Sequence, residues 1–466
     1  MELEQKIQEL QDRRRNLQMR MNASHDPFVL TFPPEISSYI LLLSMEEWDY
    51  EPGGPYGSCD ALLKKLPTPF LLGTVCRGWR QLARSSPRLW TTLSFTLAKP
   101  TKVHLFEVVT DWLQLSSGLP LAIWVPTYNG QNSVSQEISG PVIDALNQHS
   151  GRWHKVVLRI PAPYFRHFCG SSPPNSLYEL DVTNHGYLDL DGLLPTFRMN
   201  FKLSPTNLTI QNIRLSANDI GWDNLTYLSM KAMIVNECIE AIRQAPLLES
   251  CTMVNFYSAP GDVSIPKKIV RHMRLRRLTL EYNPDESFIN PLDLMECPAL
   301  EEFRSELSMN KAMTDSLVSL LNRSESRLKD LDIHMDMDGE PEVLAVEDFM
   351  KLLNAIPSLQ DLSLHCWYNN VFVMDTLLQE LSSSAPFLKE RTPGFLPHLQ
   401  SLTFSSRFGG LSTCRSIPHI YTWPHRKLLC LELMVSDAVE IDNTATKISQ
   451  LIAQGVDIRV RAGCED

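Results

Sequence analysis

Apolar positions along most of the chain follow one short phrase, apolar-x-x-apolar-x-apolar, and these phrases alternate with stretches of helical periodicity. Because alternate residues of a strand point to the same side, each phrase predicts a short strand with one buried face. The phrases start at Trp153, Leu177, Ile210, Leu225, Leu248, Leu275, Leu300, Leu328, Leu359, Leu399 and Leu428. Most starts are 23 to 31 residues apart, with exceptions of 15, 33 and 40, so the repeat is irregular.

Segments that fit a helix lie between the phrases, such as NECIEAIRQAP, TDSLVSLLNRS and VEDFMKLLNAIP. A strand–helix unit of this length cannot bury its own apolar side, so it has to stack on its neighbours. The pattern predicts an α/β protein in which residues 96–466 form a leucine-rich-repeat-like solenoid of alternating strands and helices. The asparagine ladder of regular repeats is absent, which indicates divergent repeats. An ordinary α/β sandwich is the alternative.

The first residues have a different, heptad-like pattern. Apolar residues at Leu3, Ile7, Leu10, Leu17 and Met21 form a seam, and Arg14 occupies the position of the missing apolar residue. The spacing predicts an amphipathic, coiled-coil-like helix within residues 1–24. Two roles stay open: a solvated helix that leans on the following domain, or a short self-associating coiled coil. Isolated helices of this length are marginally stable, which favours the first.

Two further amphipathic helices are predicted between residues 33 and 85. In FPPEISSYILLLSM, two prolines can begin a helix, and Ile36, Ile40 and Leu43 fall on one face. A Gly-, Pro- and acid-rich loop follows, from Glu46 to about Pro69. A second apolar stripe then consists of Leu72, Val75, Cys76, Trp79 and Leu82. Helices this short cannot bury themselves, so they need a partner surface.

The order FPPEI-x-x-x-I, then VCR-x-WR-x-LA, then SPRLW resembles the F-box, a helical module that docks onto the Skp adaptor of cullin-type ubiquitin ligases. The long form with an N-terminal helix resembles F-box proteins abundant in mushroom-forming fungi. Phe32 replaces the usual leucine, and the internal loop is longer than in a minimal F-box.

The resemblance implies that residues 25–95 form an F-box with a long internal loop. It also implies that the Skp-type adaptor binds Pro34, Ile36, Ile40, Leu72, Val75, Trp79 and Leu82. Through that adaptor the chain would reach a cullin. A helical cap that seals the end of a solenoid is the alternative interpretation.

Composition narrows the possible partners. The 466 residues carry 43 basic and 54 acidic side chains, and the net charge of −11 disfavours nucleic acid and anionic membranes as partners. No apolar run is long enough to span a bilayer, and the first residues do not resemble a signal peptide. Ten scattered cysteines without a CxxC pair suit reduced thiols, so we expect a cytoplasmic or nuclear protein.

Enzyme signatures are missing from the sequence: there is no Walker loop, GxGxxG, GxSxG or HExxH. The histidines do not pair with one another or with cysteine at ligand spacing, so we expect no metal, cofactor or catalytic residue. The phrase HMDMDG lacks oxygen donors at the first and twelfth positions of a calcium loop. The basic run KKIVRHMRLRR, residues 267–277, favours a solvated repeat edge, with an acidic protein partner as the alternative.

The third, fifth and seventh positions of each strand phrase should face away from the buried side, onto the concave sheet. On that face we expect a substrate-binding surface that includes Tyr227, Arg277, Arg304, Asp330, Asp332, Asp361 and His365. The whole pattern favours a substrate-recognition adaptor that is monomeric outside its complex and binds a protein substrate. The alternatives are a non-proteolytic repeat scaffold that works without a cullin, and a face of merely solvated residues.

Overall fold

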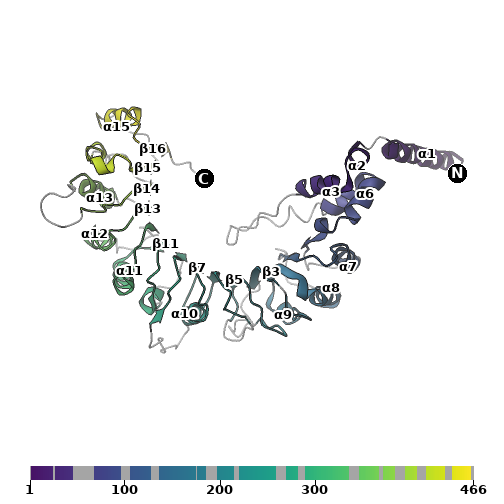
Figure 1. Ribbon diagram of the computed structural model, residues 1–466, viewed down its shortest axis with the longest axis horizontal. Helices are drawn as coiled ribbons and strands as arrows, with labels where there is room; N and C mark the ends of the chain where they lie inside the picture. The colour runs from purple at the N-terminus through teal and green to yellow at the C-terminus, as the bar shows by residue number, and fades with distance from the viewer. Residues whose placement is uncertain are drawn as a thin grey trace. The chain divides into compact units, whose positions relative to one another are not determined.

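The computed structural model describes most of the chain, with gaps between the described ranges (Figure 1). These ranges are 2–24, 27–45, 68–95, 105–126, 136–174, 176–184, 197–214, 220–258, 269–281, 289–334, 346–366, 371–383, 394–406, 416–435 and 443–462. The chain divides into two compact units, Met1–Gly221 and Trp222–Asp466, and each is described by itself.

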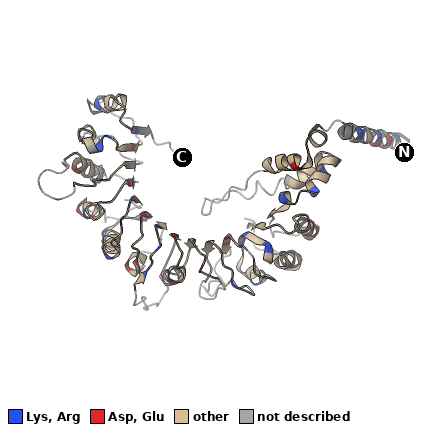
Figure 2. Cartoon of the chain, viewed as in Figure 1, with Lys and Arg blue, Asp and Glu red and all other residues tan. Residues whose placement is uncertain are grey.

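The first unit begins with helices. These are α1 (Glu2–Ser24), α2 (Pro27–Thr31), α3 (Pro34–Leu43), α5 (Thr68–Val75), α6 (Arg77–Arg84) and the 3-10 turn η1 (Pro87–Trp90). Helix α1 carries acidic and basic side chains along its length (Figure 2), and every side chain described in it, from residue 5 to residue 21, is exposed. The predicted N-terminal helix is therefore present. The predicted loop after α3 falls mainly on residues 46–67, which lie outside the described residues.

Parallel strands and further helices complete the first unit. They are β1 (Thr92–Ser94), α7 (Leu105–Leu115), β2 (Leu121–Val125), α8 (Gln136–Gln148), η2 (Ser150–Arg152), β3 (Trp153–Ile160), α9 (Ala162–Phe165), β4 (Glu179–Asn184) and β5 (Asn207–Gln211). The strands pair in chain order, β1-β2-β3-β4-β5, and every pair is parallel. A parallel neighbour requires a crossover, and α7, α8 and α9 lie in the crossovers from β1 to β4.

The second unit repeats this arrangement. Its elements are β6 (Tyr227–Lys231), α10 (Val235–Gln244), β7 (Ser250–Val254), β8 (Val270–Arg271), β9 (Arg277–Glu281), η3 (Pro291–Leu294), β10 (Met295–Glu296), β11 (Glu302–Ser308), α11 (Lys311–Ser324), β12 (Asp330–His334), α12 (Val346–Asn354), β13 (Asp361–Cys366), α13 (Val371–Ser383), β14 (Ser401–Ser406), α14 (Ile417–Ile420), η5 (Pro424–Arg426), β15 (Cys430–Val435), α15 (Asn443–Ala453) and β16 (Ile458–Ala462). The main strand order is β6-β7-β9-β11-β12-β13-β14-β15-β16, and β8 pairs with β10 in a separate small sheet.

The apolar phrases explain this register. Leu331 lies opposite Leu362, and Ile333 lies opposite Leu364 on the next strand. All four side chains are at most 1% exposed. Equivalent positions of successive strands therefore stack into one continuous apolar layer, which supplies the core that one repeat alone cannot form.

The other side of these strands is polar. Within the second unit, α10, α11, α12 and α13 lie along one side of the strand row (Figure 1). None of the described helices of this unit covers the opposite side, where half-buried residues alternate with the buried Leu331 and Ile333 along β12. We call this side the helix-free face. The structure confirms a mixed α/β chain of parallel strands and intervening helices, as the apolar phrases predict.

One predicted phrase was placed wrongly. The phrase that starts at Ile210 implies a strand from about residue 212, but β5 covers Asn207–Gln211. The buried residues Leu208 and Ile210 hold the fourth and sixth positions, so the phrase starts at Pro205. This correction removes the irregular spacings of 33 and 15 residues, which become 28 and 20.

Candidate functional site

The helices of residues 27–90 are held together by aromatic side chains. Trp79 of α6 packs against Phe28 of α2 with ring centroids 5.0 Å apart. Trp90 of η1 contacts Phe70 of α5 at 5.2 Å and Trp112 of α7 at 5.1 Å. The indole of Trp90 also donates a hydrogen bond of 2.7 Å to the Ala83 carbonyl, so its one polar group is satisfied. The two tryptophans of this sequence stretch are therefore internal supports of the helical module.

Local hydrogen bonds fix the junction between α5 and α6. Cys76 is the N-cap of α6, and its Sγ accepts a hydrogen bond of 3.4 Å from the backbone N–H of Trp79. The Nε of Arg80 donates to the Gly73 carbonyl at 2.8 Å. The cap starts α6 directly after α5, and the Arg80 contact ties α6 back to α5.

The predicted adaptor-binding residues divide into three groups by exposure. Pro34, Ile36, Ile40 and Val75 are exposed, Leu72 and Trp79 are half-buried, and Leu82 is only 7% exposed. In the chain alone, Leu82 therefore belongs to the core of the helical module, and the Trp79 ring packs against Phe28.

Several exposed apolar residues were missing from the prediction. We define the apolar helical surface as Phe32, Ile36, Tyr39, Ile40 and Leu43 from α3 and its N-terminal flank, with Leu71 and Val75 from α5. On α3 these residues share one side, whereas the buried Ser37 and Leu41 lie on another. Both α3 and α5 pack against α6, which holds the two exposed stripes in place. Tyr39 could have been identified from the sequence, because Ile36, Tyr39, Ile40 and Leu43 are spaced at i, i+3, i+4 and i+7.

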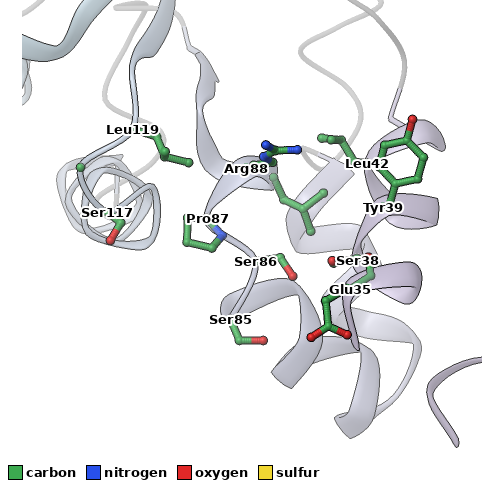
Figure 3. Close-up of a pocket in the computed structure, with 12 residues that line it drawn as sticks. Glu35, Ser38, Tyr39, Leu42, Ser85, Ser86, Pro87, Arg88, Ser117 and Leu119 are labelled. Atoms are coloured by element: carbon green, nitrogen blue, oxygen red, sulfur yellow. Dashed lines mark hydrogen bonds between the residues drawn. The ribbon is translucent and has the colours of Figure 1, made fainter. Parts of the chain in front are cut away.

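A groove adjoins this surface. It has a volume of about 610 Å³ and lies between α3, η1 and the turn that follows α7 (Figure 3). Glu35 and Tyr39 come from α3, Arg88 comes from η1, and Ser117 and Leu119 come from the turn. The groove is therefore lined by both charged and apolar side chains beside the exposed stripe of α3.

The second candidate region lies on the helix-free face of β11, β12 and β13. The register places Arg304 opposite Asp332, Asp330 opposite Asp361 and His334 opposite His365. Arg304 Nε lies 3.5 Å from Asp332 Oδ2, and His365 Nε2 lies 3.0 Å from Asp332 Oδ1. The His334 and His365 rings have centroids 4.7 Å apart. The structure thus brings together five of the predicted substrate-binding residues: Arg304, Asp330, Asp332, Asp361 and His365.

The absence of histidines at ligand spacing in the sequence did not anticipate the contact of His334 with His365, because the two residues are 31 positions apart in the chain. Their common place in consecutive phrases, LDIH and LSLH, is the signal that could have found them, because equivalent repeat positions become neighbours in a parallel sheet.

The carboxylates and imidazoles of this region influence one another. Burial, followed by repulsion from Asp361, raises the pKa of Asp330 to about 6. Burial alone would raise the pKa of Asp332, but the hydrogen bond and charge of His365 outweigh it and lower that pKa. Burial and the neighbouring His365 lower the pKa of His334. The protonation of each of these side chains therefore depends both on its burial and on the charges of its neighbours.

The remaining predicted residues lie on earlier strands of the same unit. Tyr227 of β6 is half-buried, and burial raises the pKa of its hydroxyl. Arg277 of β9 is exposed. The structure does not bring either residue into contact with the Asp332–His365 pair.

The basic run and the calcium-like phrase have separate outcomes. Within the run, His272 is buried, Arg271 pairs with Glu296 at 3.0 Å and Arg276 approaches Glu301 at 4.0 Å. Two of the four arginines in the run, Arg271 and Arg276, therefore have acidic partners within the unit. The phrase HMDMDG lies outside the described residues after His334.

Comparisons with known proteins add little. No protein-family model matches the chain, and no curated protein sequence matches it. Among solved structures, the chain is similar to that of the TLR13–ssRNA13 complex, with 15% identity and a TM-score of 0.31. The match covers 71% of this chain and 51% of the other, so the chain spans about half the length of that protein. A similarity at this level carries no functional conclusion.

A search of the described helices for membrane spans was negative: none combines the length and apolar character needed to cross a bilayer.

Proposed function

We propose that the chain is a protein-interaction adaptor with an F-box at its N-terminus, in which the apolar helical surface docks onto a Skp-type adaptor. The supporting observation is the exposure of large apolar side chains on two short, adjoining helices. Ile36 is 47% exposed, Val75 is 52% exposed and Leu43 is 66% exposed. Exposed apolar patches rimmed by polar residues are typical of protein interaction sites.

The parallel strands supply the second half of the proposal. The helix-free face of the second unit, with Arg304, Asp330, Asp332, Asp361 and His365, would hold a charged polypeptide substrate while the assembled ligase transfers ubiquitin to it. Charged residues of both signs favour a polypeptide of complementary charge over a small apolar ligand. The chain itself would carry no catalytic residue.

The test uses co-purification of the full chain with a Skp-type adaptor. Val75→Glu and Ile36→Glu each place a charge on the apolar helical surface without removing a buried side chain. We expect each to weaken adaptor binding by at least about 30-fold, equivalent to about 2 kcal/mol at a hot spot. Trp79→Ala is a poorer test, because Trp79 also packs on Phe28 within the module.

Leu428→Glu is the matched control, since Leu428 is a 92% exposed leucine in the second unit. It should leave adaptor binding unchanged. Equal binding by the parent chain and both surface variants would contradict the proposal. The presence of a cullin among the co-purified proteins separates the ligase function from the alternative, a scaffold that binds a Skp-type adaptor and acts without proteolysis.

A further inference from the structure

Three side chains with metal-ligand chemistry meet on the helix-free face of β12 and β13. Asp332 and His334 are two residues apart on β12, so they point to the same side of the sheet. His365 lies directly opposite His334 on β13. One ligand atom from each of the three residues can be chosen so that all lie within 4.8 Å of one another. This grouping arises from the parallel register of two repeats.

The separations suit a single small ion. Two ligands bound tetrahedrally to zinc at about 2.0–2.2 Å are about 3.3 Å apart. Asp332 Oδ1 and His365 Nε2 already lie 3.0 Å apart. The His334 ring stands beside the His365 ring at a centroid distance of 4.7 Å, and a His334 ring nitrogen lies within 4.8 Å of a ligand atom of each of the other two residues.

A neighbouring arginine orients the carboxylate. Arg304 Nε approaches Oδ2 of Asp332, and Oδ1 is the oxygen that faces His365. Such an outer contact is typical of metal sites, where it fixes the direction of the ligand. Acidic residues also exceed basic ones nearby, because Glu302, Asp330 and Asp361 occupy consecutive strands in one row.

The cluster has access from one side. The Asp332 side chain is 21% exposed and that of His365 is 30% exposed, so neither side chain is sealed in the core, whereas Asp332 Oδ1 itself is buried. Two imidazoles and one carboxylate leave a coordination position for a water molecule or for a side chain of a bound protein. Imidazole ligands favour zinc and other transition ions over magnesium or calcium.

We propose that Asp332, His334 and His365 bind one divalent transition-metal ion, Zn²⁺ foremost, with a coordination position open toward the helix-free face. The proposal is independent of the proposed function, since it uses only the geometry of β11, β12 and β13.

Isothermal titration of the full, reduced chain with Zn²⁺ tests it. We expect one ion per chain, and a loss of affinity of at least about 100-fold in His334→Gln, His365→Gln and Asp332→Asn, since even outer-contact changes cost about 10- to 100-fold. Asp361→Asn keeps the three ligands and removes a neighbouring acid, and His419→Gln removes an exposed histidine elsewhere. Both controls should bind like the parent.

Cobalt provides a second readout that does not depend on variants. Co²⁺ bound to the parent chain should give visible ligand-field bands without a thiolate charge-transfer band, because the proposed ligands contain no sulfur. X-ray absorption of the zinc-loaded chain should show nitrogen and oxygen neighbours at about 2.0–2.2 Å and imidazole scattering. This measurement remains informative if a variant fails to fold.

Three results would overturn the assignment. The first is the absence of saturable Zn²⁺ binding by the parent chain. The second is unchanged affinity in a folded His334→Gln/His365→Gln double variant. The third is a sulfur shell around the bound ion, which would place the metal on cysteines.

Discussion

His272 shows how one buried side chain links stability to pH. Its imidazole is 5% exposed, Nδ1 accepts a hydrogen bond of 3.0 Å from the Leu275 backbone N–H, and Nε2 lies 2.8 Å from the Ala245 carbonyl. These contacts require a neutral ring with its proton on Nε2. Burial lowers the pKa of His272, and the hydrogen bond to Ala245 only partly offsets this effect.

The sign of the pH effect follows from that lowered pKa. The unfolded chain binds the proton at its ordinary pKa, whereas the folded chain resists it, so stability falls as the pH drops below about 6.5. We expect the free energy of unfolding to decrease between about pH 7.5 and pH 5.5, and His272→Gln to weaken this dependence. The variant should also lose about 1–3 kcal/mol at the higher pH through unsatisfied backbone groups.

Urea unfolding at both pH values measures these effects, with the exposed His154→Gln as control. A pH dependence that is identical in the parent and in His272→Gln would contradict the assignment of the ring as neutral.

At the scale of elements, arginines tie one repeat to the preceding one. Arg426 of η5 is 1% exposed and donates to the carbonyls of Leu396 and Phe395 at 2.8 and 2.5 Å. Arg323 of α11 similarly donates to carbonyls of the η3–β10 segment, 28 and 31 residues earlier. Arg152 donates to Leu119, 33 residues earlier. These side chains give backbone carbonyls of an earlier segment a charged donor.

We expect Arg426→Ala to destabilise the chain by about 2–4 kcal/mol, because two buried carbonyls lose charge-assisted donors and the long stem leaves a void. Burial lowers the pKa of Arg426 to about 10, so the guanidinium remains charged near neutral pH. Lys427→Ala is the adjacent control at an exposed position. Thermal unfolding of both variants checks the prediction, and equal midpoints would show that the carbonyl contacts contribute nothing.

The strands were the most predictable elements, because their apolar phrases repeat. Strands β6, β7, β9 and β11 to β15 each begin two residues after the first residue of a predicted phrase. In β12, for example, the apolar residues of the phrase, Leu331 and Ile333, are buried as predicted. The short strands β8 and β10 were missed, since two residues carry no periodicity. The phrase at Ile210 was misplaced because Ile210 and Ile213 have the spacing of its first two apolar positions, although Ile213 lies after the end of β5 and is buried there.

For the molecule as a whole, side-chain partners were harder to predict than faces. The alternation of strand residues placed Asp332 and His365 on one face, and the register then brought them to 3.0 Å. The register depends on where each connecting loop ends, which the apolar pattern alone does not give. The pairing of His334 with His365 could therefore be found only by aligning the phrases LDIH and LSLH. The burial of Leu82 could not be predicted either, because helical spacing alone does not show whether an apolar face contacts the rest of the chain or a partner.

The association state of the whole chain depends on α1. Its seam residues Ile7, Leu10 and Leu17 are 49%, 61% and 52% exposed, and Arg14 interrupts them. A charge in the centre of a seam of fewer than three heptads disfavours a coiled coil. We therefore expect a monomer at micromolar concentration, and deletion of residues 2–21 should change the mass only by the deleted segment.

Arg14→Leu completes the seam, so it should shift the chain toward a dimer as concentration rises. Arg13→Leu adds the same apolar side chain outside the seam and serves as the matched control. Sedimentation velocity over a range of concentrations distinguishes the two variants. If the parent chain already sediments as a dimer and the deletion variant as a monomer, α1 is a self-association element despite Arg14, and two substrate-binding units would then be joined in one particle.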